Sequence, residues 1–169
     1  MISRRSACGG ASRQGGRQRP GKAGSAVALG WAICLTIAAP AALAQMSPVG
    51  LWRSIDDRSG EARAEIRITE LAGVVTGRIE RRVAKESRPG EVCEECRDER
   101  RGKPLDGMEI IRNARKAQDG EAWEGGRILD PESGREYTLR LAPIDGGQKL
   151  QVRGYIGPFF RTQTWVRVQ

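Results

Sequence analysis

The fold of this chain is indicated above all by its alternation of apolar and polar residues. Apolar residues stand at every second position in runs that turn sequences interrupt at short intervals. The alternation is clearest in four segments: 62–69, 75–83, 136–141 and 149–156. Less regular runs of the same kind cover four more: 50–56, 107–116, 121–129 and 162–168. A period of two places successive side chains on opposite faces of a β-strand, so each segment is predicted to be a strand with one buried face.

Glycine, aspartate and serine, the residues that tight turns favour, gather between these runs. The turn sequences lie at 57–60, 72–73, 119–120, 131–134 and 145–147. No convincing amphipathic helix separates the strands, which favours antiparallel hairpins over a parallel α/β sheet. An open meander of about eight strands leaves two edges unpaired, and closure into a barrel removes both. The sequence therefore predicts an all-β fold, a single small antiparallel up-and-down barrel.

Residues 1–44 have the three-part layout of a secretory signal peptide. A basic region at 1–22 precedes an uncharged apolar run at 23–39, and Ala42-Leu43-Ala44 provides an A-x-A cleavage pattern. A membrane anchor is the alternative, but the apolar run is short for a span. We expect cleavage near Ala44, a periplasmic or secreted product, and a mature domain of residues 45–169 without stable membrane insertion.

The distribution of charge argues against a nucleic-acid partner. The chain has 29 basic and 21 acidic side chains, a formal net charge of +8, and no histidine. Six basic residues and no acidic ones lie in 1–44, so the rest of the chain is close to neutral. General nucleic-acid binding therefore loses its main support. The absence of histidine also excludes Ser-His-Asp triads, histidine metal sites and histidine pH switches.

Segment 84–106 is the exception to the strand pattern. It is dense in charged residues and has no apolar face that could hold it against a core. We therefore predict a long solvated connection. A loop of this length is often functional, although a solvated loop is the commoner explanation of such a charge run.

Cys93 and Cys96 are the only cysteines of residues 45–169. In an oxidising compartment two thiols this close should pair as a structural disulfide. A redox role would need a helix N-terminus or a cation nearby, whereas two glutamates lie between the thiols. Zinc would need two further ligands, which could only be carboxylates such as Glu91 or Asp98. We expect the disulfide, with no metal and no cofactor.

Two segments, 123–126 and 154–160, combine aromatic residues with glycine. A phosphate-binding loop would lead into a helix, and no helical pattern follows either segment. We therefore expect β-bulges or backbone bends at barrel corners. Our candidate ligand-binding residues come from these segments, with the last three at a pocket mouth: Trp123, Tyr155, Phe159 and Phe160. Plain packing is the commoner role of such aromatic residues, and it is the interpretation that we favour for Tyr155, Phe159 and Phe160.

Trp52 opens the first predicted strand within Gly50-Leu51-Trp52, while Arg161 and Arg167 flank Trp165 in the last. The first and last strands of a closed barrel are neighbours, so an arginine could lie across the Trp52 ring. This arrangement resembles the Gly-x-Trp and C-terminal arginine signature of lipocalin-like barrels. We favour Arg161 as the partner, because Arg167 is close to the chain end, where order is poorer.

Several stretches together resemble one known family: Gly50-Leu51-Trp52, residues 92–96, 107–110, 123–134 and 152–157, and Arg161-Thr162-Gln163-Thr164-Trp165-x-Arg167. Over residues 48–168 the chain resembles the domain of unknown function 2147 family of exported bacterial proteins. The resemblance implies a small lipocalin-like β-barrel behind a signal peptide. It brings no established activity and no active-site residues.

Two functions are consistent with these features. The first is a periplasmic binding module whose barrel holds a small, largely apolar molecule, since small barrels are either filled by side chains or leave room for one ligand. Small residues on inward faces (Ala62, Ala64, Gly77 and Gly154) would leave that room. The alternative is an envelope interaction or stress protein with a filled barrel, which acts through segment 84–106 on an unidentified protein partner.

Enzymatic activity is not expected. The candidate acids, Asp56, Glu109 and Asp130, lack any recognisable pairing in the sequence, and each also fits a turn or a strand face.

Overall fold

The structure is a computed structural model that describes residues 46–169, so the predicted signal peptide lies outside the described residues. Eight strands follow in chain order: β1 (Gly50–Ile55), β2 (Ala62–Leu71), β3 (Val74–Arg82), β4 (Glu109–Lys116), β5 (Trp123–Asp130), β6 (Arg135–Ile144), β7 (Lys149–Ile156) and β8 (Phe159–Arg167). A short 3-10 turn, Asp145–Gly147, joins β6 to β7.

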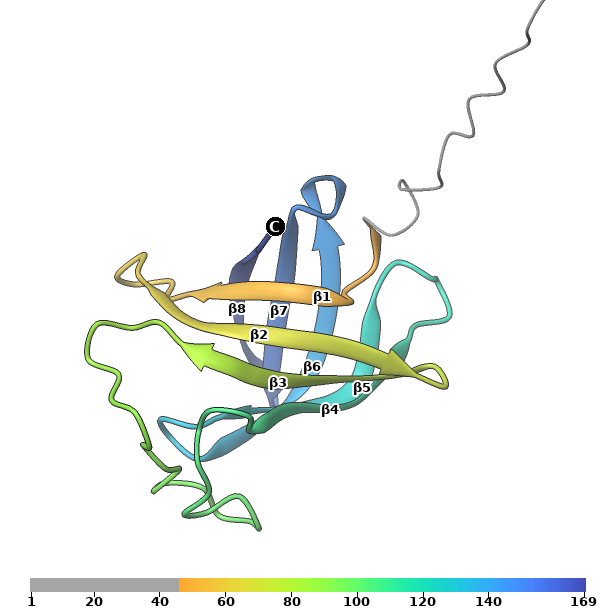
Figure 1. Cartoon of the computed structure of the whole chain (residues 1–169). Helices are drawn as coiled ribbons and strands as arrows, with labels where there is room; N and C mark the ends of the chain where they lie inside the picture. The colour runs from red at the N-terminus through yellow and green to blue at the C-terminus, as the bar shows by residue number, and fades with distance from the viewer. Residues whose placement is uncertain (1–45) are drawn as a thin grey trace, which may run out of the picture. The chain divides into compact units, whose positions relative to one another are not determined.

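Each strand pairs antiparallel with the next, and β8 returns to pair with β1 (Figure 1). The closing register places Trp52 opposite Arg167 and Arg53 opposite Val166. The prediction of an all-β, eight-stranded, antiparallel up-and-down barrel is therefore confirmed, and each strand falls on a segment that the alternation marked.

The period of two decides which side chains enter the barrel. On β2, for example, Ile66 and Ile68 are buried inside, while the intervening Arg67 is exposed on the outer wall. The largest fully buried side chains of the core are Trp52, Ile66, Ile68, Ile111, Leu139, Leu141, Leu150 and Val75. Burial of these apolar surfaces is the main favourable contribution to the fold.

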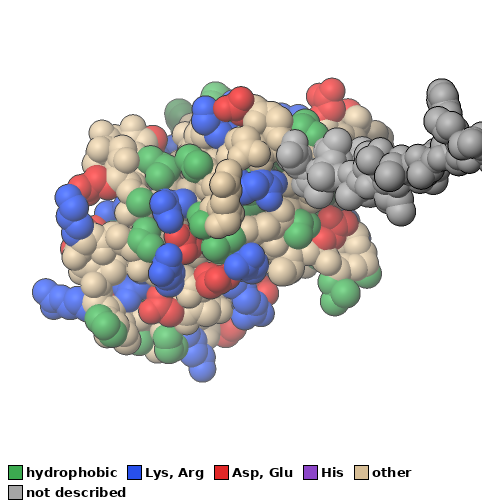
Figure 2. All heavy atoms as spheres, turned by 45° about the horizontal axis from the view of Figure 1, so that its top comes forward, with side chains coloured by type: hydrophobic (Ala, Val, Ile, Leu, Met, Phe, Trp, Pro, Cys, Tyr) green, Lys and Arg blue, Asp and Glu red, His purple; other side chains and the backbone are tan. Residues whose placement is uncertain are grey.

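The outer wall is covered by charges of both signs. Figure 2 shows Lys and Arg side chains interspersed with Asp and Glu on the face in view. Across β1–β3, Glu65 accepts hydrogen bonds from Arg53 at 2.7 Å and from Arg81 at 2.8 Å, and Arg67 pairs with Glu80. The two guanidinium groups cover Glu65, so the carboxylate is buried although it lies on the outside of the barrel.

The two glycine-aromatic segments have different roles. The register of β5 against β6 shifts between Glu124 and Gly126, which confirms a bulge at the first segment. In the second segment Gly157 and Pro158 form the tight turn between β7 and β8, with Gly157 in the left-handed region at φ +56°. This part of the second segment is therefore a hairpin turn rather than a bend within one strand.

The connection between β3 and β4 is not simply solvated, so that expectation for segment 84–106 was wrong. Cys93 and Cys96, joined by a disulfide, are both buried within the core cluster. The segment also folds back on itself, because Cys93 N–H donates to Lys103 at 2.9 Å and Leu105 N–H donates to Glu91 at 2.9 Å. The sequence pattern concealed this because the buried groups are a cystine and an arginine rather than an apolar stripe.

That arginine is Arg100, which is only 4% exposed. Its guanidinium forms ion pairs with Asp98 and Glu136 and donates to the carbonyl oxygen of Glu109 at 3.1 Å. Burial opposes the charge, yet the hydrogen bonds with Asp98 and Glu136 leave the pKa of Arg100 raised. The contacts attach the connection to β4 and β6, because a buried charge is tolerated only when it is paired and hydrogen-bonded.

The turn between β5 and β6 packs against the same connection. Gly134 has φ +64°, and a methyl group there would overlap the carbonyl oxygen of Glu95. The Cys93 sulfur lies 3.6 Å from the carbonyl oxygen of Pro131 in the same turn. Gly134 is therefore required both by its backbone conformation and by the close approach of the neighbouring chain.

The connections sort to the two ends of the barrel, as an up-and-down topology requires. The end formed by residues 56–61, 83–108, 131–134 and 157–158 is called the open end below. The end formed by residues 46–49, 72–73, 117–122, 145–148 and 168–169 is called the closed end.

Candidate functional site

A cavity of about 340 Å³ lies within the barrel toward the open end. This volume falls in the range of small-molecule pockets, about 300–1,000 Å³. All eight strands contribute to the lining, in order from β1 to β8: Ser54, Ile66, Ile79, Ile110, Ile128, Tyr137, Val152 and Trp165.

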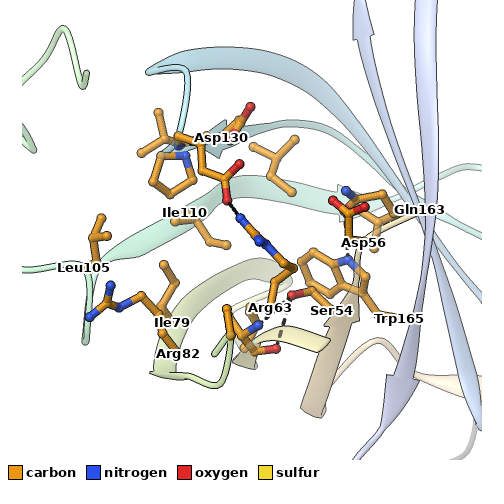
Figure 3. Close-up of a pocket in the computed structure, with 18 of the residues that line it drawn as sticks. Ser54, Asp56, Arg63, Ile79, Arg82, Leu105, Ile110, Asp130, Gln163 and Trp165 are labelled. Carbon is orange, nitrogen blue, oxygen red and sulfur yellow. Dashed lines mark hydrogen bonds and ion pairs between the residues drawn. The ribbon is translucent and has the colours of Figure 1, made fainter. Parts of the chain in front are cut away.

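The buried part of the lining is apolar. Ile66, Ile79, Val152 and Trp165 are all buried core residues that also border the cavity. Trp165 has the largest side chain of the four, and Figure 3 shows its ring beside Ser54 and Gln163. An occupant at this depth would therefore meet hydrocarbon and an aromatic ring rather than charge.

Two polar side chains lie among these apolar groups, and both have partners within the protein. The Ser54 hydroxyl accepts a hydrogen bond from the Ala64 N–H at 3.1 Å and lies 3.2 Å from the Ala64 carbonyl oxygen, to which it donates. Gln163 Oε1 accepts a hydrogen bond from Trp165 Nε1 at 3.2 Å. These bonds use the Ser54 hydroxyl and Gln163 Oε1 within the protein, and most of the remaining inner lining is apolar.

The small residues expected to leave room differ in what they do. Ala64 and Gly154 border the cavity as expected. The face of Gly154, however, is covered by Tyr137, since a Cβ there would lie 3.0 Å from Tyr137 Cβ. Gly77 does not border the cavity, because Ile111 fills the space beside it. A Cβ added at Gly77 would lie 2.9 Å from Ile111 Cδ1. The expectation was therefore wrong for Gly77, and also for Ala62, which does not border the cavity.

Charged side chains form the mouth of the cavity. Arg63, at the start of β2, pairs with Glu86 of the long connection at 2.5 Å and with Glu132 of the β5–β6 turn. Figure 3 shows the Arg63 side chain extending across the cavity toward the end of β5 that carries Asp130. One guanidinium therefore links three separate segments around the mouth.

The other arginines that line the cavity are also paired. Arg82 contacts Glu91 and lies 3.4 Å from Asp106. Arg161 donates to Asp57 of the β1–β2 turn at 3.1 Å. This hydrogen bond holds the pKa of Asp57 below its ordinary value and raises the pKa of Arg161. The mouth is therefore a ring of ion pairs around an apolar interior.

Trp52 closes the opposite end of the barrel and is fully buried. Its Nε1 donates to the carbonyl oxygen of Pro48 at 2.6 Å, and the Arg167 guanidinium lies 4.1 Å from the ring centroid. Arg167 also donates to three backbone carbonyl oxygens, those of Gly147, Val49 and Ser47, at 2.6 to 3.0 Å. Burial lowers the pKa of Arg167.

The preference for Arg161 as the partner of Trp52 was therefore wrong. The β1–β8 register places Arg167 directly opposite Trp52, whereas Arg161 lies six residues earlier on β8 and reaches the open end. Although Arg167 lies near the chain end, its guanidinium is held by hydrogen bonds to three carbonyl oxygens. Trp165, expected to help close the barrel, lines the cavity instead.

None of the four candidate ligand-binding residues borders the cavity. Trp123 is buried below Lys116, whose amine lies 5.5 Å from the ring centroid. Tyr155 and Phe160 face outward from the barrel, while Phe159 lies beside the turn between β7 and β8 and is exposed. Strand parity could have shown this for Tyr155 and Phe160, because their parity is opposite to that of Val152 and Trp165, which face inward.

Sequence reasoning also missed Arg63 as a residue of the mouth. Its position in an alternating run marks an outward or terminal side chain, and nothing local indicates that the β5–β6 turn lies within its reach. The contact depends on which turns meet at the open end.

The three carboxylates considered as catalytic acids all have local structural partners. Asp56 accepts hydrogen bonds from the backbone N–H groups of Ser59 and Arg58, which lower its pKa. Asp130 accepts a hydrogen bond from the Ser133 hydroxyl at 2.7 Å, and Glu109 pairs with Arg78 at 3.0 Å. Within residues 46–169, no group of three or more Cys, Asp or Glu side chains is arranged to hold a metal ion.

A scan of the described part of the chain finds no helix with the length and apolar character that a transmembrane span requires.

Comparison with known families bears directly on this barrel. Residues 50–167 match the model of a family described as an uncharacterized protein conserved in bacteria (DUF2147). The chain belongs to this family. The resemblance inferred from the sequence motifs is therefore confirmed over nearly the whole barrel. No curated protein matches the chain.

A solved structure with a similar fold is that of protein HP1028 from Helicobacter pylori, which is described as belonging to the lipocalin family. The two chains are 16% identical, and the match covers 73% of this chain and 84% of that chain with a TM-score of 0.63. At this identity the similarity establishes the fold alone. This DUF2147 member is a lipocalin-like barrel.

Proposed function

We propose that the barrel binds one small, predominantly apolar molecule in its inner cavity. The observation that carries the proposal is the cavity itself, about 340 Å³ in volume, with a buried lining of isoleucine, valine and tryptophan. Transfer of an apolar molecule from water into such a lining is favourable because apolar surface leaves water on both sides. The lipocalin-like fold supports the same proposal, since small barrels of this kind can hold one ligand.

The cavity favours this function over the alternative of a filled barrel that acts through segment 84–106. A filled barrel would place side chains where the cavity lies. In addition, part of the segment is buried against the barrel, which reduces the surface that it offers to a partner.

A fluorescent apolar probe tests the proposal directly. N-phenyl-1-naphthylamine, which is uncharged and brightens in apolar surroundings, is titrated into the purified protein. We compare Ala64→Phe, which places a ring in the cavity, with Ala142→Phe, which adds the same ring on the outward parity of β6. We expect probe affinity to fall about tenfold or more in the first variant and to stay unchanged in the second.

Native mass spectrometry of the same proteins provides an independent measurement. A small molecule that co-purifies with the wild type and is lost from Ala64→Phe, while circular dichroism shows an intact barrel, supports the proposal. Absence of both a co-purified molecule and probe binding in the folded wild type contradicts it.

We infer further that the protein works outside the cytoplasm, in a periplasmic or secreted form. The Cys93–Cys96 disulfide supports this inference, because disulfides persist mainly in oxidising compartments. N-terminal sequencing of the protein from an envelope fraction is expected to begin at Gln45. A full-length product confined to the cytoplasm would contradict the inference.

A further inference from the structure

The tip of the β7–β8 hairpin exposes an unusual amount of apolar surface. Three large side chains project there, with Ile156 51% exposed, Phe159 74% and Phe160 60%. They lie on either side of the turn, since Ile156 pairs with Phe159 and Tyr155 pairs with Phe160. An exposed cluster of this kind usually marks an interaction site rather than a solvent-facing surface.

Basic side chains flank the tip on both sides. The Arg153 guanidinium lies 4.8 Å from the centroid of the Phe160 ring. Ile156 borders a surface hollow together with three further arginines, Arg97, Arg127 and Arg135. Four guanidinium groups therefore lie near the apolar tip, one over Phe160 and three beside the hollow that Ile156 borders.

Most of this positive charge is not neutralised locally. The two acids that border the hollow, Asp98 and Glu136, are both ion-paired with the buried Arg100, and Glu136 also pairs with Arg127 at 3.7 Å. Within residues 46–169, no ion pair involves Arg97, Arg135 or Arg153. This contrasts with the cavity mouth, where Arg63, Arg82 and Arg161 all have acidic partners. The surface around the tip thus carries a local excess of positive charge.

We propose that this surface, the hairpin tip (residues 155–160) with Arg97, Arg127, Arg135 and Arg153, docks the protein on an anionic lipid bilayer. Guanidinium groups bind phosphate headgroups well, because their donors match phosphate oxygens in a bidentate arrangement. The apolar side chains enter the boundary between headgroups and acyl chains, and the barrel itself stays outside the membrane.

The shape of the tip favours a bilayer over a protein partner. Phe159 and Phe160 are consecutive residues of a strand, so their side chains point to opposite sides of the hairpin. A protein surface that meets one side of the hairpin would leave one ring exposed. A fluid interface surrounds the projecting turn and covers both rings together.

The location of the tip adds a consequence for the cavity. The turn between β7 and β8 belongs to the open end, and Arg161, the residue after Phe160, lines the cavity. Docking through the tip therefore holds the mouth of the cavity close to the membrane surface. The docking proposal does not depend on a cavity ligand, since vesicle binding and probe binding are measured separately.

Flotation with lipid vesicles tests the proposal. Purified protein is mixed with vesicles of phosphatidylcholine alone or of phosphatidylcholine with phosphatidylglycerol. We expect binding to the mixed vesicles, little binding to phosphatidylcholine alone, and loss of binding as salt concentration rises, because salt screens exposed charges.

Three variants separate the contributions of the tip. In Phe159→Ser/Phe160→Ser we expect binding to the mixed vesicles to fall about tenfold or more, since two apolar anchors are lost. In Arg97→Gln/Arg135→Gln/Arg153→Gln we expect the preference for phosphatidylglycerol to disappear. Leu71→Ser is the matched control, because Leu71 is 83% exposed at the closed end, and it should bind like the wild type.

Several outcomes would overturn the proposal. One is a folded wild type that does not float with the mixed vesicles, and another is an equal loss of binding in Leu71→Ser. A concentration-dependent dimer that the Phe159→Ser/Phe160→Ser variant abolishes, in the absence of vesicle binding, would assign the tip to a second copy of the chain. The Ala64→Phe variant should still bind vesicles, so failure of the ligand proposal and failure of the docking proposal remain distinguishable.

Discussion

The two ends of this barrel are built from different interactions. At the closed end a buried tryptophan fills the barrel, and Arg167 covers it while donating to backbone carbonyl oxygens. At the open end a ring of arginine–carboxylate pairs surrounds an apolar cavity, with Arg63 linking segments that are far apart in the chain. Backbone carbonyl oxygens do not titrate, and they move only when the backbone moves. Surface ion pairs are readily replaced by contacts with water and are screened by salt. The closed end therefore mainly stabilises the barrel, whereas the open end gives access to the cavity.

The largest expected effect is at the closed end. Trp52→Ala removes a fully buried side chain, and we expect the free energy of unfolding to fall by about 3–5 kcal/mol. This is a large share of the roughly 5–15 kcal/mol by which a typical domain is stable. Urea denaturation followed by circular dichroism measures the change. A loss below about 1 kcal/mol, the usual cost of an average substitution, would show that the closed end is not the stable one.

The second prediction compares two arginines of the same strand. We expect Arg167→Met to destabilise the protein by about 2–3 kcal/mol, because three hydrogen bonds from a charged donor are lost and the partly buried carbonyl oxygens of Gly147 and Ser47 lose that partner. Arg161→Met removes an exposed pair with Asp57 and should cost at most about 1 kcal/mol. Urea denaturation of both variants measures this difference.

A double-mutant cycle with Trp52→Ala sharpens that comparison. Only Arg167 should show coupling to Trp52, of about 1–2 kcal/mol for a desolvated cation–π contact. Additive effects for Arg167 would contradict the role assigned to the stacked guanidinium.

A smaller effect is expected for the disulfide of the open end. Replacing Cys93 and Cys96 by alanine opens a very short loop, so the entropic loss is about 2 kcal/mol, and the barrel should remain folded. The melting temperature should fall by roughly 8 °C, because about 4 °C is lost for each kcal/mol in a domain of this size. Complete unfolding of this variant would contradict the prediction and show that the barrel cannot fold without the disulfide.

The smallest expected effect is the loss of stability at the open end when the pH is lowered. Hydrogen bonds from Arg161 and from Arg100 hold the pKa values of Asp57 and Asp98 below their ordinary values. Such carboxylates stabilise the fold above their unfolded pKa, about 4, and that contribution is lost as the pH falls through the lower folded value. The open end should therefore loosen first on acidification, because the contacts of Arg167 are carbonyl oxygens that do not titrate.

Amide hydrogen exchange measures this difference. Between pH 7 and about pH 3 we expect protection to decrease for residues 84–106, while residues beside Trp52 in β1 and β8 stay protected. Exchange rates are first corrected for their intrinsic pH dependence. Equal loss of protection at both ends would remove the distinction between them.

The sequence predicted the barrel well because strands are marked locally. Each alternating run contains its own evidence, so all eight strands could be located without knowledge of their partners. The turn glycines and the bulge near Gly125 followed from backbone conformation in the same way. Family membership also followed from short motifs that stand in the chain as continuous stretches.

The candidate site was predicted less well, because a cavity is made by residues that are distant in the chain. Aromatic residues near glycine drew attention to Phe159 and Phe160, which the structure leaves outside, while the inward parity of Val152 was not used. Segment 84–106 was misjudged for a related reason. The side chains that it buries, a cystine and Arg100, become compatible with the interior only through the disulfide and through Asp98 and Glu136.

The alternation and the turn residues were sufficient to predict the fold class and the number and approximate positions of the strands. The tertiary structure alone decided that Arg167 rather than Arg161 covers Trp52, that a cavity remains, and that Arg63 spans its mouth. The reason is the distance along the chain over which each effect acts. Alternation and turn preference act between neighbouring residues, whereas the position of a side chain at one end of a barrel depends on strand length and on the register at which β8 meets β1.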